Sequence, residues 1–203
     1  MKFSIKTYLY LVILVVLSIW YGIVMWWTIN PQASDEYRMY YIKRNIIGWP
    51  GEDGSKVFLG ETLAFSPRIS GRFPLTLSEG WSHQTDEGYW SKTGDSVLYL
   101  RFPQPLKQPV EMHICCRGSN QNNSTGSLQL LLNNHIVQTF SLSTSVVTTH
   151  IITIPNTWFM SDHINKITFR TCSINKRGKQ PPNSCGFCLQ SIVFSYSNTS
   201  ICL

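Results

Sequence analysis

Charged side chains are scarce in this sequence of 203 residues: Asp, Glu, Lys and Arg together make up 14% of it, against roughly a quarter in average soluble domains. Carboxylates are rarest toward the C-terminus, where only Glu111 and Asp162 follow Asp95. Hydrolysis of a glycosidic bond needs two carboxylates facing each other across the bond. A second acid is hard to find here, so we do not expect a glycosidase.

Motifs for metal binding and nucleophilic catalysis are also missing. The five histidines, at positions 83, 113, 135, 150 and 163, show no H-E-x-x-H or other close ligand spacing. No G-x-S-x-G elbow and no phosphate-binding loop occurs. The sequence therefore predicts a protein that is not an enzyme, has no assigned metal site and needs no cofactor.

A concentrated basic patch is the third absence. The chain has a net charge of +6, but its basic residues are scattered, apart from Lys43-Arg44 and a group at positions 176, 177 and 179. Proteins that bind nucleic acid gather such charge on one face, often among stacking aromatics. We therefore expect no nucleic-acid partner. The hydrophobic share of 43% also excludes a disordered chain, which cannot bury a core.

One long apolar run is present near the N-terminus. Tyr8 to Trp27 contains twenty residues without a charge. At 1.5 Å per residue this run spans roughly 30 Å, the thickness of a bilayer's hydrocarbon layer. Tyr10 at one end, and Trp26 beside Trp27 at the other, suit the two membrane interfaces. The run predicts a single transmembrane helix.

The alternative is a cleaved signal peptide. Its apolar region usually covers about 7–15 residues and ends in small residues before the cleavage site. Here the run is longer and ends in two tryptophans, and Pro31-Gln32-Ala33-Ser34 is a poor substitute for an A-x-A site. These features favour an uncleaved signal anchor.

Flanking charges predict the orientation of the span. Lys2 and Lys6 precede it, whereas Asp35 and Glu36 follow it. The positive-inside rule then keeps the short N-terminus in the cytoplasm and exports the rest. The predicted organisation is a cytoplasmic N-terminus at 1–7, a transmembrane signal anchor at 8–28, a juxtamembrane connector at 29–56 and an exported domain at 57–203.

The connector contains one helix signal. Ser34, followed by two acidic residues, is typical of a helix N-terminus, and we expect a short helix from there to about Ile46. Its tyrosines 37, 40 and 41 are expected at the membrane interface.

From Val57 onward the sequence shows no helical period. Short runs rich in β-branched and aromatic residues recur between turn signals, which is typical of strands. The clearest are Val97–Phe102, Val110–Cys115, Ser127–Leu132, His135–Leu142, Thr149–Ile154, Lys166–Thr171 and Cys188–Tyr196. Seven or more antiparallel strands without helices predict an all-β fold, an antiparallel β-sandwich or jelly roll preceded by one transmembrane helix.

Two local patterns refine this prediction. Within Lys166–Thr171, Ile167 and Phe169 are expected on one face of the strand and the polar residues on the other. Asn133-Asn134 lies between two strand runs and predicts a two-residue hairpin, because asparagine tolerates the positive φ that a type I′ turn requires.

All six cysteines follow the predicted span, at positions 115, 116, 172, 185, 188 and 202, and disulfides can form in exported domains. A Cys172–Cys185 bridge would close a loop rich in Lys, Gly and Pro and contribute about 3 kcal/mol in the chain-entropy model. Cys185 and Cys188 have redox-motif spacing, but no βαβ pattern surrounds them. We expect two disulfides and one or two buried or free thiols, with the connectivity left open.

The most distinctive segment runs from Gly80-Trp81-Ser82 to Gly88-Tyr89-Trp90-Ser91 and Gly94. It resembles the G-W-S…G-x-W-S-x-G signature of a β-sandwich module attached to bacterial envelope glycosyltransferases and phosphoglycerol transferases. The similarity extends over residues 65–196, through the hairpin at Leu131–Asn134 and the last strand from Gly186 to Ile192. The resemblance implies a carbohydrate-binding-like jelly roll, although this chain carries no transferase domain and has Thr85 where the family often has Glu.

Five residues of this segment are candidate sugar contacts. Trp81, Tyr89 and Trp90 are aromatics suited to stacking on a pyranose ring, and Asp86 and Glu87 are suited to accept hydrogen bonds from its hydroxyls. Each has an alternative: the tryptophans as core anchors of the first strand pair, and the two acids as a solvated turn or, with backbone carbonyls, a calcium site.

These observations predict a single-pass inner-membrane protein with its C-terminal domain in the periplasm. The first hypothesis is a non-catalytic, carbohydrate-binding-like accessory module of cell-envelope glycan assembly or modification, whose partners are an envelope glycan or a glycan-modifying transferase. The alternative is a structural or assembly subunit of an envelope complex that binds protein. An unrecognised hydrolase is the third and weakest hypothesis.

Overall fold

The computed structural model describes residues 5–30, 33–51, 53–74, 76–92, 94–119, 126–143, 146–173 and 186–197, without the side chains of residues 83, 172 and 173. The chain divides into two compact units, Met1–Ser34 and Asp35–Leu203. The segment 35–56, predicted as part of a connector, thus belongs to the same compact unit as the β-rich region.

The first unit contains α1, Ile5–Ile29, a helix of 25 residues with no buried residue. Its length and apolar composition are those of a helix able to cross a membrane. A core helix of a soluble protein buries its apolar side chains, whereas those of α1 are exposed. The single apolar N-terminal helix predicted from the sequence is therefore present.

The second unit begins with a helical segment that is shorter than expected. It consists of α2, Asp35–Tyr37, and a π-helical turn η1, Arg38–Ile42. The prediction of a helix to about Ile46 is wrong, because the backbone turns at Arg44, whose φ is +53°. This turn lets Ile46 pack into the interior, where only 6% of it is exposed.

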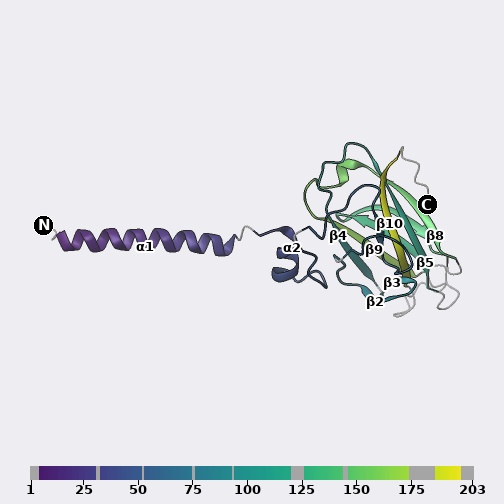
Figure 1. Cartoon of the computed structure of the whole chain (residues 1–203), viewed down its shortest axis with the longest axis horizontal. Helices are drawn as coiled ribbons and strands as arrows, with labels where there is room; N and C mark the ends of the chain where they lie inside the picture. Colours follow the sequence, from purple (N-terminus) through teal and green to yellow (C-terminus); the bar gives the residue numbers. More distant parts are fainter. Residues whose placement is uncertain are drawn as a thin grey trace. The chain divides into compact units, whose positions relative to one another are not determined.

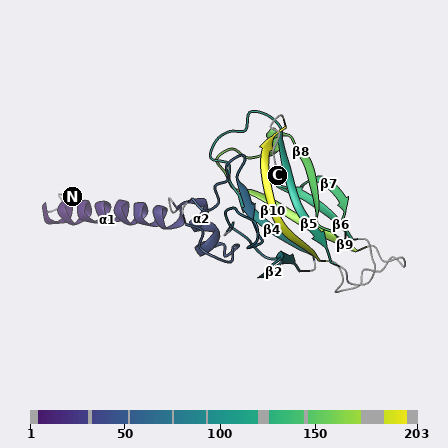
Figure 2. The same ribbon diagram turned by 45° about the vertical axis from the view of Figure 1, so that its right-hand side comes forward.

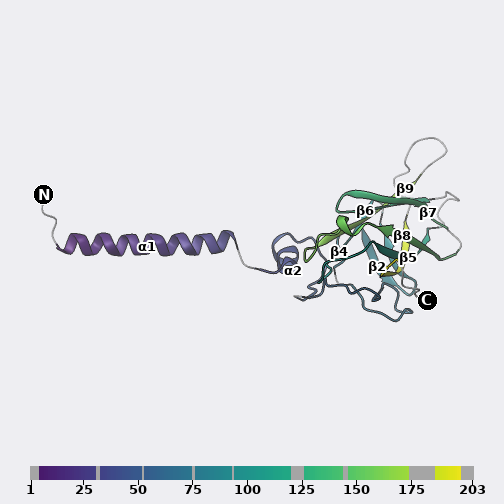
Figure 3. The ribbon, with the colours of Figure 1, turned by 90° about the horizontal axis from the view of Figure 1, so that it is seen from above.

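In the part of the chain that the structure describes, ten strands follow and form two antiparallel sheets, which confirms the predicted all-β sandwich (Figure 1). One sheet has the order β2-β3-β10-β5-β8, with β1 also paired to β10, and the other has the order β4-β9-β6-β7. Figure 3 shows the two sheets as separate layers. The strands are β1 (Thr62–Ala64), β2 (Trp81–Thr85), β3 (Gly88–Ser91), β4 (Asp95–Leu100), β5 (Val110–Gly118), β6 (Gly126–Leu132), β7 (His135–Ser141), β8 (Thr148–Ile154), β9 (Asn165–Ser173) and β10 (Phe187–Tyr196).

The core lies between the sheets and is built by alternation along the strands. In β9, Ile167 and Phe169 are buried in the core, whereas Arg170 is exposed, as the pattern of that run predicts. Full burial of a large apolar side chain contributes roughly 1.5–3 kcal/mol. The largest fully buried side chains are Phe65, Phe169, Phe187 and Phe194.

The predicted asparagine hairpin is confirmed. Asn133 and Asn134 have φ values of +49° and +71° and connect β6 to β7, as a type I′ turn requires. The Asn133 side chain also accepts a hydrogen bond from the Lys166 backbone N–H at 2.9 Å and donates one to the Trp158 carbonyl at 3.1 Å. The turn thereby fastens β9 and the loop before it.

Candidate functional site

The glycines and tryptophans of residues 80–94 first of all build the sandwich. Gly80 has a φ of +88°, and a Cβ there would lie 2.0 Å from the Asp95 carbonyl oxygen. A Cβ at Gly88 would lie 2.2 Å from the Leu189 carbonyl oxygen on β10. Only glycine permits both approaches. The Ser91 hydroxyl accepts a buried hydrogen bond of 2.8 Å from the Phe187 backbone N–H.

Trp81 is a core residue. Only 3% of it is exposed, its ring packs against Phe65, Phe169 and Phe187, and its indole N–H donates to the Val97 carbonyl at 2.8 Å. A ring buried in this way offers no face to a sugar, so the expected sugar contact of Trp81 is wrong. The alternative, a core anchor of the first strand pair, is the one that the structure supports.

Tyr89 lies on the opposite face of β3 from Trp90. Its ring stacks on Phe73 with centroids 5.3 Å apart and packs against the core. Burial raises the pKa of the Tyr89 hydroxyl, which keeps this group protonated in neutral solution. The structure therefore separates Tyr89 from the other candidates, and its role toward a sugar stays a prediction.

Trp90 and Glu87 meet a residue that was not predicted, Arg117 of β5. Trp90, Cys188 and Arg117 lie in one row across β3, β10 and β5. Above the small Cys188 side chain, the Arg117 guanidinium lies 5.7 Å from the centre of the Trp90 ring, a distance at which cations and rings attract. The same guanidinium forms an ion pair with the Glu87 carboxylate.

Asp86 is the neighbour of Glu87 in the turn between β2 and β3. Its carboxylate accepts a hydrogen bond from Arg68 at 3.3 Å, and its backbone carbonyl accepts one from the Ser66 hydroxyl at 2.9 Å. The loop at residues 66–68 thus holds the turn in place. We name the group the hairpin patch and define it as Arg68, Asp86, Glu87, Trp90 and Arg117.

The hairpin patch combines a ring with planar charged groups that water reaches. Side-chain exposure is 70% at Arg68, 80% at Asp86, 44% at Glu87 and 28% at Arg117. Exposed ion pairs contribute little, typically about 0–1 kcal/mol. Ligand hydroxyls can therefore replace either ionic partner at small cost, donating to the carboxylates and accepting from the guanidinium groups. Arg117 carries no signal in its own sequence neighbourhood, since only strand pairing brings it to Trp90.

The described cysteines are thiols. Cys115, Cys116 and Cys188 are free, which leaves too few cysteines for the two disulfides expected. Burial raises the pKa of Cys116 to about 12 and that of Cys188 to about 11, so neither is a reactive thiolate. The predicted Cys172–Cys185 bridge lies outside the described residues, because Cys185 and the Cys172 side chain are not described.

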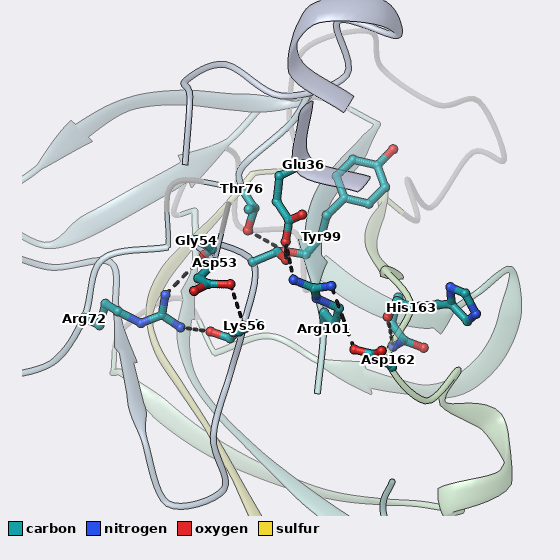
Figure 4. Close-up of polar contacts among 12 residues, drawn as sticks. Glu36, Asp53, Gly54, Lys56, Arg72, Thr76, Tyr99, Arg101, Asp162 and His163 are labelled. Atoms are coloured by element: carbon teal, nitrogen blue, oxygen red, sulfur yellow. Dashed lines mark hydrogen bonds and ion pairs between the residues drawn. The ribbon is translucent and has the colours of Figure 1, made fainter. Parts of the chain in front are cut away.

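A second polar cluster, also not predicted, lies where residues 35–56 meet the sandwich (Figure 4). The buried Glu36 carboxylate pairs with Arg101 at 2.9 Å and accepts a hydrogen bond from the Ser55 hydroxyl. Arg101 also approaches the exposed Asp162 at 3.8 Å. The sequence indicated Glu36 as a charge flanking the apolar run and as an acidic residue near a helix start, and not as a buried partner of Arg101, which lies 65 positions away.

Beside this cluster a pocket of ≈ 410 Å³ opens between η1 and the loop before β9. Tyr99 and His163, which project to the same side in Figure 4, are among its lining residues together with Arg38, Lys43 and Asp35. The charged residues of its lining are two basic side chains and one acidic side chain. Among the described residues, no group of three or more His, Cys, Asp or Glu side chains could hold a metal ion.

Comparison with known proteins gives no family. No family model and no curated protein matches the sequence. Similar solved structures include the xylan-binding module CBM15, with 10% identity over 71% of this chain and 96% of that chain and a TM-score of 0.45. The carbohydrate-binding module CBM36 in complex with calcium and xylotriose has 11% identity over 66% of this chain and 98% of that chain, with a TM-score of 0.41.

A protein of another kind is equally similar. The insecticidal delta-endotoxin Cry8Ea1 from Bacillus thuringiensis has 12% identity over 71% of this chain and 25% of that chain, with a TM-score of 0.47. All three scores lie below 0.5, and they say nothing of what this chain binds.

Proposed function

We propose that this protein is a non-catalytic, membrane-anchored module that binds carbohydrate through the hairpin patch. Its role is that of an accessory module in the assembly or modification of cell-envelope glycans. The observation that carries the proposal is the contact of the Arg117 guanidinium with both the Trp90 ring and the Glu87 carboxylate, next to the Asp86–Arg68 pair of the same turn.

The chemistry of the patch suits a polyhydroxylated ligand. Binding sites combine an apolar surface with a few placed polar groups, and Trp90 supplies the former here. Carboxylate and guanidinium groups are strong hydrogen-bonding partners with planar, bidentate geometry, which matches neighbouring hydroxyls on a sugar ring. Because each charge in the patch is already paired, a neutral glycan leaves no charge uncompensated when it binds.

The apolar helix α1 supplies the anchor in this proposal. An uncleaved α1 with a cytoplasmic N-terminus places the sandwich on the periplasmic side of the inner membrane. There the hairpin patch would hold a glycan chain close to a partner transferase in the same membrane, so that the module raises the local concentration of substrate.

The test is a calorimetric titration of the full chain, in detergent, with a panel of neutral and uronic-acid oligosaccharides. We expect Trp90→Ala and Arg117→Ala each to weaken binding by about tenfold or more, because a central aromatic or arginine contact contributes at least 1–2 kcal/mol. Arg170→Ala is the matched control, since Arg170 pairs with Asp95 on the outer face of the other sheet.

Two outcomes would overturn the proposal. One is the absence of binding to every oligosaccharide at millimolar concentration while the protein remains folded by circular dichroism. The other is binding that Arg170→Ala weakens as much as Arg117→Ala does, because the site would then lie elsewhere.

A further inference from the structure

The edges of the two sheets are protected unequally. An unprotected edge strand presents free N–H and C=O groups and invites pairing with another chain, so proteins usually blunt it with a bulge, a short strand, a charge or a covering segment. Three of the edges in this sandwich carry such a device. The fourth edge strand is β8.

The edge of β4 is covered by the segment before β2. The Ser78 backbone N–H donates to the Val97 carbonyl at 3.0 Å, and the Val97 N–H donates to the Glu79 carbonyl at 3.2 Å. On the other sheet β1 has only three residues, and the Ala64 N–H donates to the Arg72 carbonyl at 2.9 Å. The neighbouring β2 is short, and its pairing with β3 shifts register.

The edge of β7 is bulged. Gln138 pairs with Leu130, and Ile136 pairs with the next residue, Leu131, so that Val137 is the extra residue. A bulge bends and twists its strand, which makes continuous pairing with a further strand harder.

Among the described residues, none of these devices is found at β8. It pairs with β5 in an unbroken register from Cys116↔Thr148 to Val110↔Ile154. The strand contains no proline and no charged residue, and six of its seven residues, all except His150, are the β-branched residues Thr or Ile. Within the described part of the chain, no hydrogen bond reaches its free edge.

The absence of charge extends well beyond β8. From Gly118 to Ser161 the sequence contains no Asp, Glu, Lys or Arg. This stretch includes β6, β7 and β8. The edge strands β7 and β8 lie side by side (Figure 2), and the rings of Phe140 on β7 and His150 on β8 stack with their centroids 4.1 Å apart. Burial lowers the pKa of His150, which keeps the ring neutral at pH 7.

We propose that β8 is a homodimer interface, in which two copies of this chain pair their β8 strands antiparallel across a two-fold axis. The exposed apolar residue at the centre of the contact is Ile151, 58% of which is exposed in the single chain. The proposal is independent of sugar binding, because the hairpin patch belongs to β3, the β2–β3 turn and their neighbours rather than to β8.

Two features favour a second copy as the partner. With a net charge of +6, two copies repel each other wherever basic surfaces meet, whereas a charge-free face lets them approach. The strand is also complementary to itself: a two-fold axis at Ile151 places this residue opposite its own copy and Thr149 opposite Thr153. Such β-branched and Thr–Thr pairs stabilise antiparallel strands.

The test compares matched lysine substitutions on the two edges. Ile151 on β8 and Ile136 on β7 are 58% and 57% exposed, so a lysine is equally compatible with folding at either position. Analytical ultracentrifugation of the full chain in detergent measures the dimer dissociation constant. We expect the wild type to be a dimer. The dissociation constant should increase about tenfold or more for Ile151→Lys and change by less than about twofold for Ile136→Lys.

A cross-linking experiment keeps the test independent of lysine effects. In a Cys115→Ser background, Ile151→Cys is expected to give a covalent dimer with a short bismaleimide, and Ile136→Cys is not. A monomeric wild type would overturn the proposal, and so would a dimer that both lysine variants weaken equally or that cross-links equally at both positions. Loss of glycan binding alone would leave the dimer intact and would refute only the proposed function.

Discussion

Two glutamate–arginine pairs in this molecule have the same chemistry and different surroundings. Glu36 and Arg101 lie in the interior, with 0% and 15% of their side chains exposed, whereas Glu87 and Arg117 are 44% and 28% exposed. The first pair joins α2 to the sandwich, and the second lies on the surface beside Trp90. The comparison shows that burial, rather than residue type, decides whether a pair is part of the architecture or is accessible to a ligand.

The physical basis is the cost of removing charge from water. A buried carboxylate that loses its partner leaves the other charge without compensation, which is strongly destabilising. An exposed pair exchanges its partner for water with little change in free energy. The pairs should therefore respond differently to the same substitution.

The largest effect is expected for Glu36→Ala. Removing one member of a buried pair should lower the free energy of unfolding by about 3–5 kcal/mol, because Arg101 then remains buried without its carboxylate. Urea denaturation of the detergent-solubilised chain, followed by circular dichroism, measures this change.

The control replaces both members. Glu36→Leu combined with Arg101→Met should regain at least about half of the lost stability, since apolar residues of similar volume often substitute well for a buried ion pair. A single Glu36→Ala variant as stable as the wild type would contradict the structural role of this pair.

Glu87→Ala should have a much smaller effect on stability. The Glu87–Arg117 pair is accessible to water, so we expect a decrease below about 1 kcal/mol in the same denaturation experiment. Oligosaccharide affinity, in contrast, should fall severalfold. If Glu87→Ala were as destabilising as Glu36→Ala, the surface pair would be structural and the contrast between the two pairs would disappear.

The smallest effect concerns a third pair, Asp95 and Arg170, and its pH dependence. Hydrogen bonds from Arg170 hold the pKa of the Asp95 carboxyl below its usual value of 3.8. A lowered folded-state pKa stabilises the fold above the unfolded value, and this contribution is lost as the pH falls through the folded value. At pH 7, Asp95→Asn should decrease stability by less than about 1 kcal/mol because the pair is exposed.

Urea titrations of the wild type and Asp95→Asn at pH 7 and in acid check this prediction. The two proteins should differ at pH 7 and converge once Asp95 is protonated. A difference that persists or grows in acid would mean that Asp95 acts through something other than its charge.

Much of the fold followed from local patterns. The seven strand runs predicted from the sequence all correspond to strands, from β4 to β10, and the asparagine turn lies where Asn133 and Asn134 indicate. These features depend on neighbours along the chain: alternation, turn residues and β-branched runs. Their prediction succeeded because each signal is contained within a few residues.

The candidate site was predicted only in part. The sequence pointed to Trp81 and Trp90 alike, but the register of β2 against β3 shifts between Trp81 and Gln84, and simple alternation cannot determine which tryptophan faces the core. Arg117 lies 30 positions from Glu87, so nothing near either residue predicts their pairing.

The sequence by itself determined one apolar helix and a β-rich region whose strands and turns lie where local periodicity places them. Only the tertiary structure decided that Trp81 is buried, that Glu36 is an interior charge, and that β8 lies at the end of its sheet with no further described strand beside it. The reason is physical: periodicity is a property of consecutive residues, whereas burial, ionic partners and free edges depend on which strands meet, and strand pairing joins residues far apart in the chain.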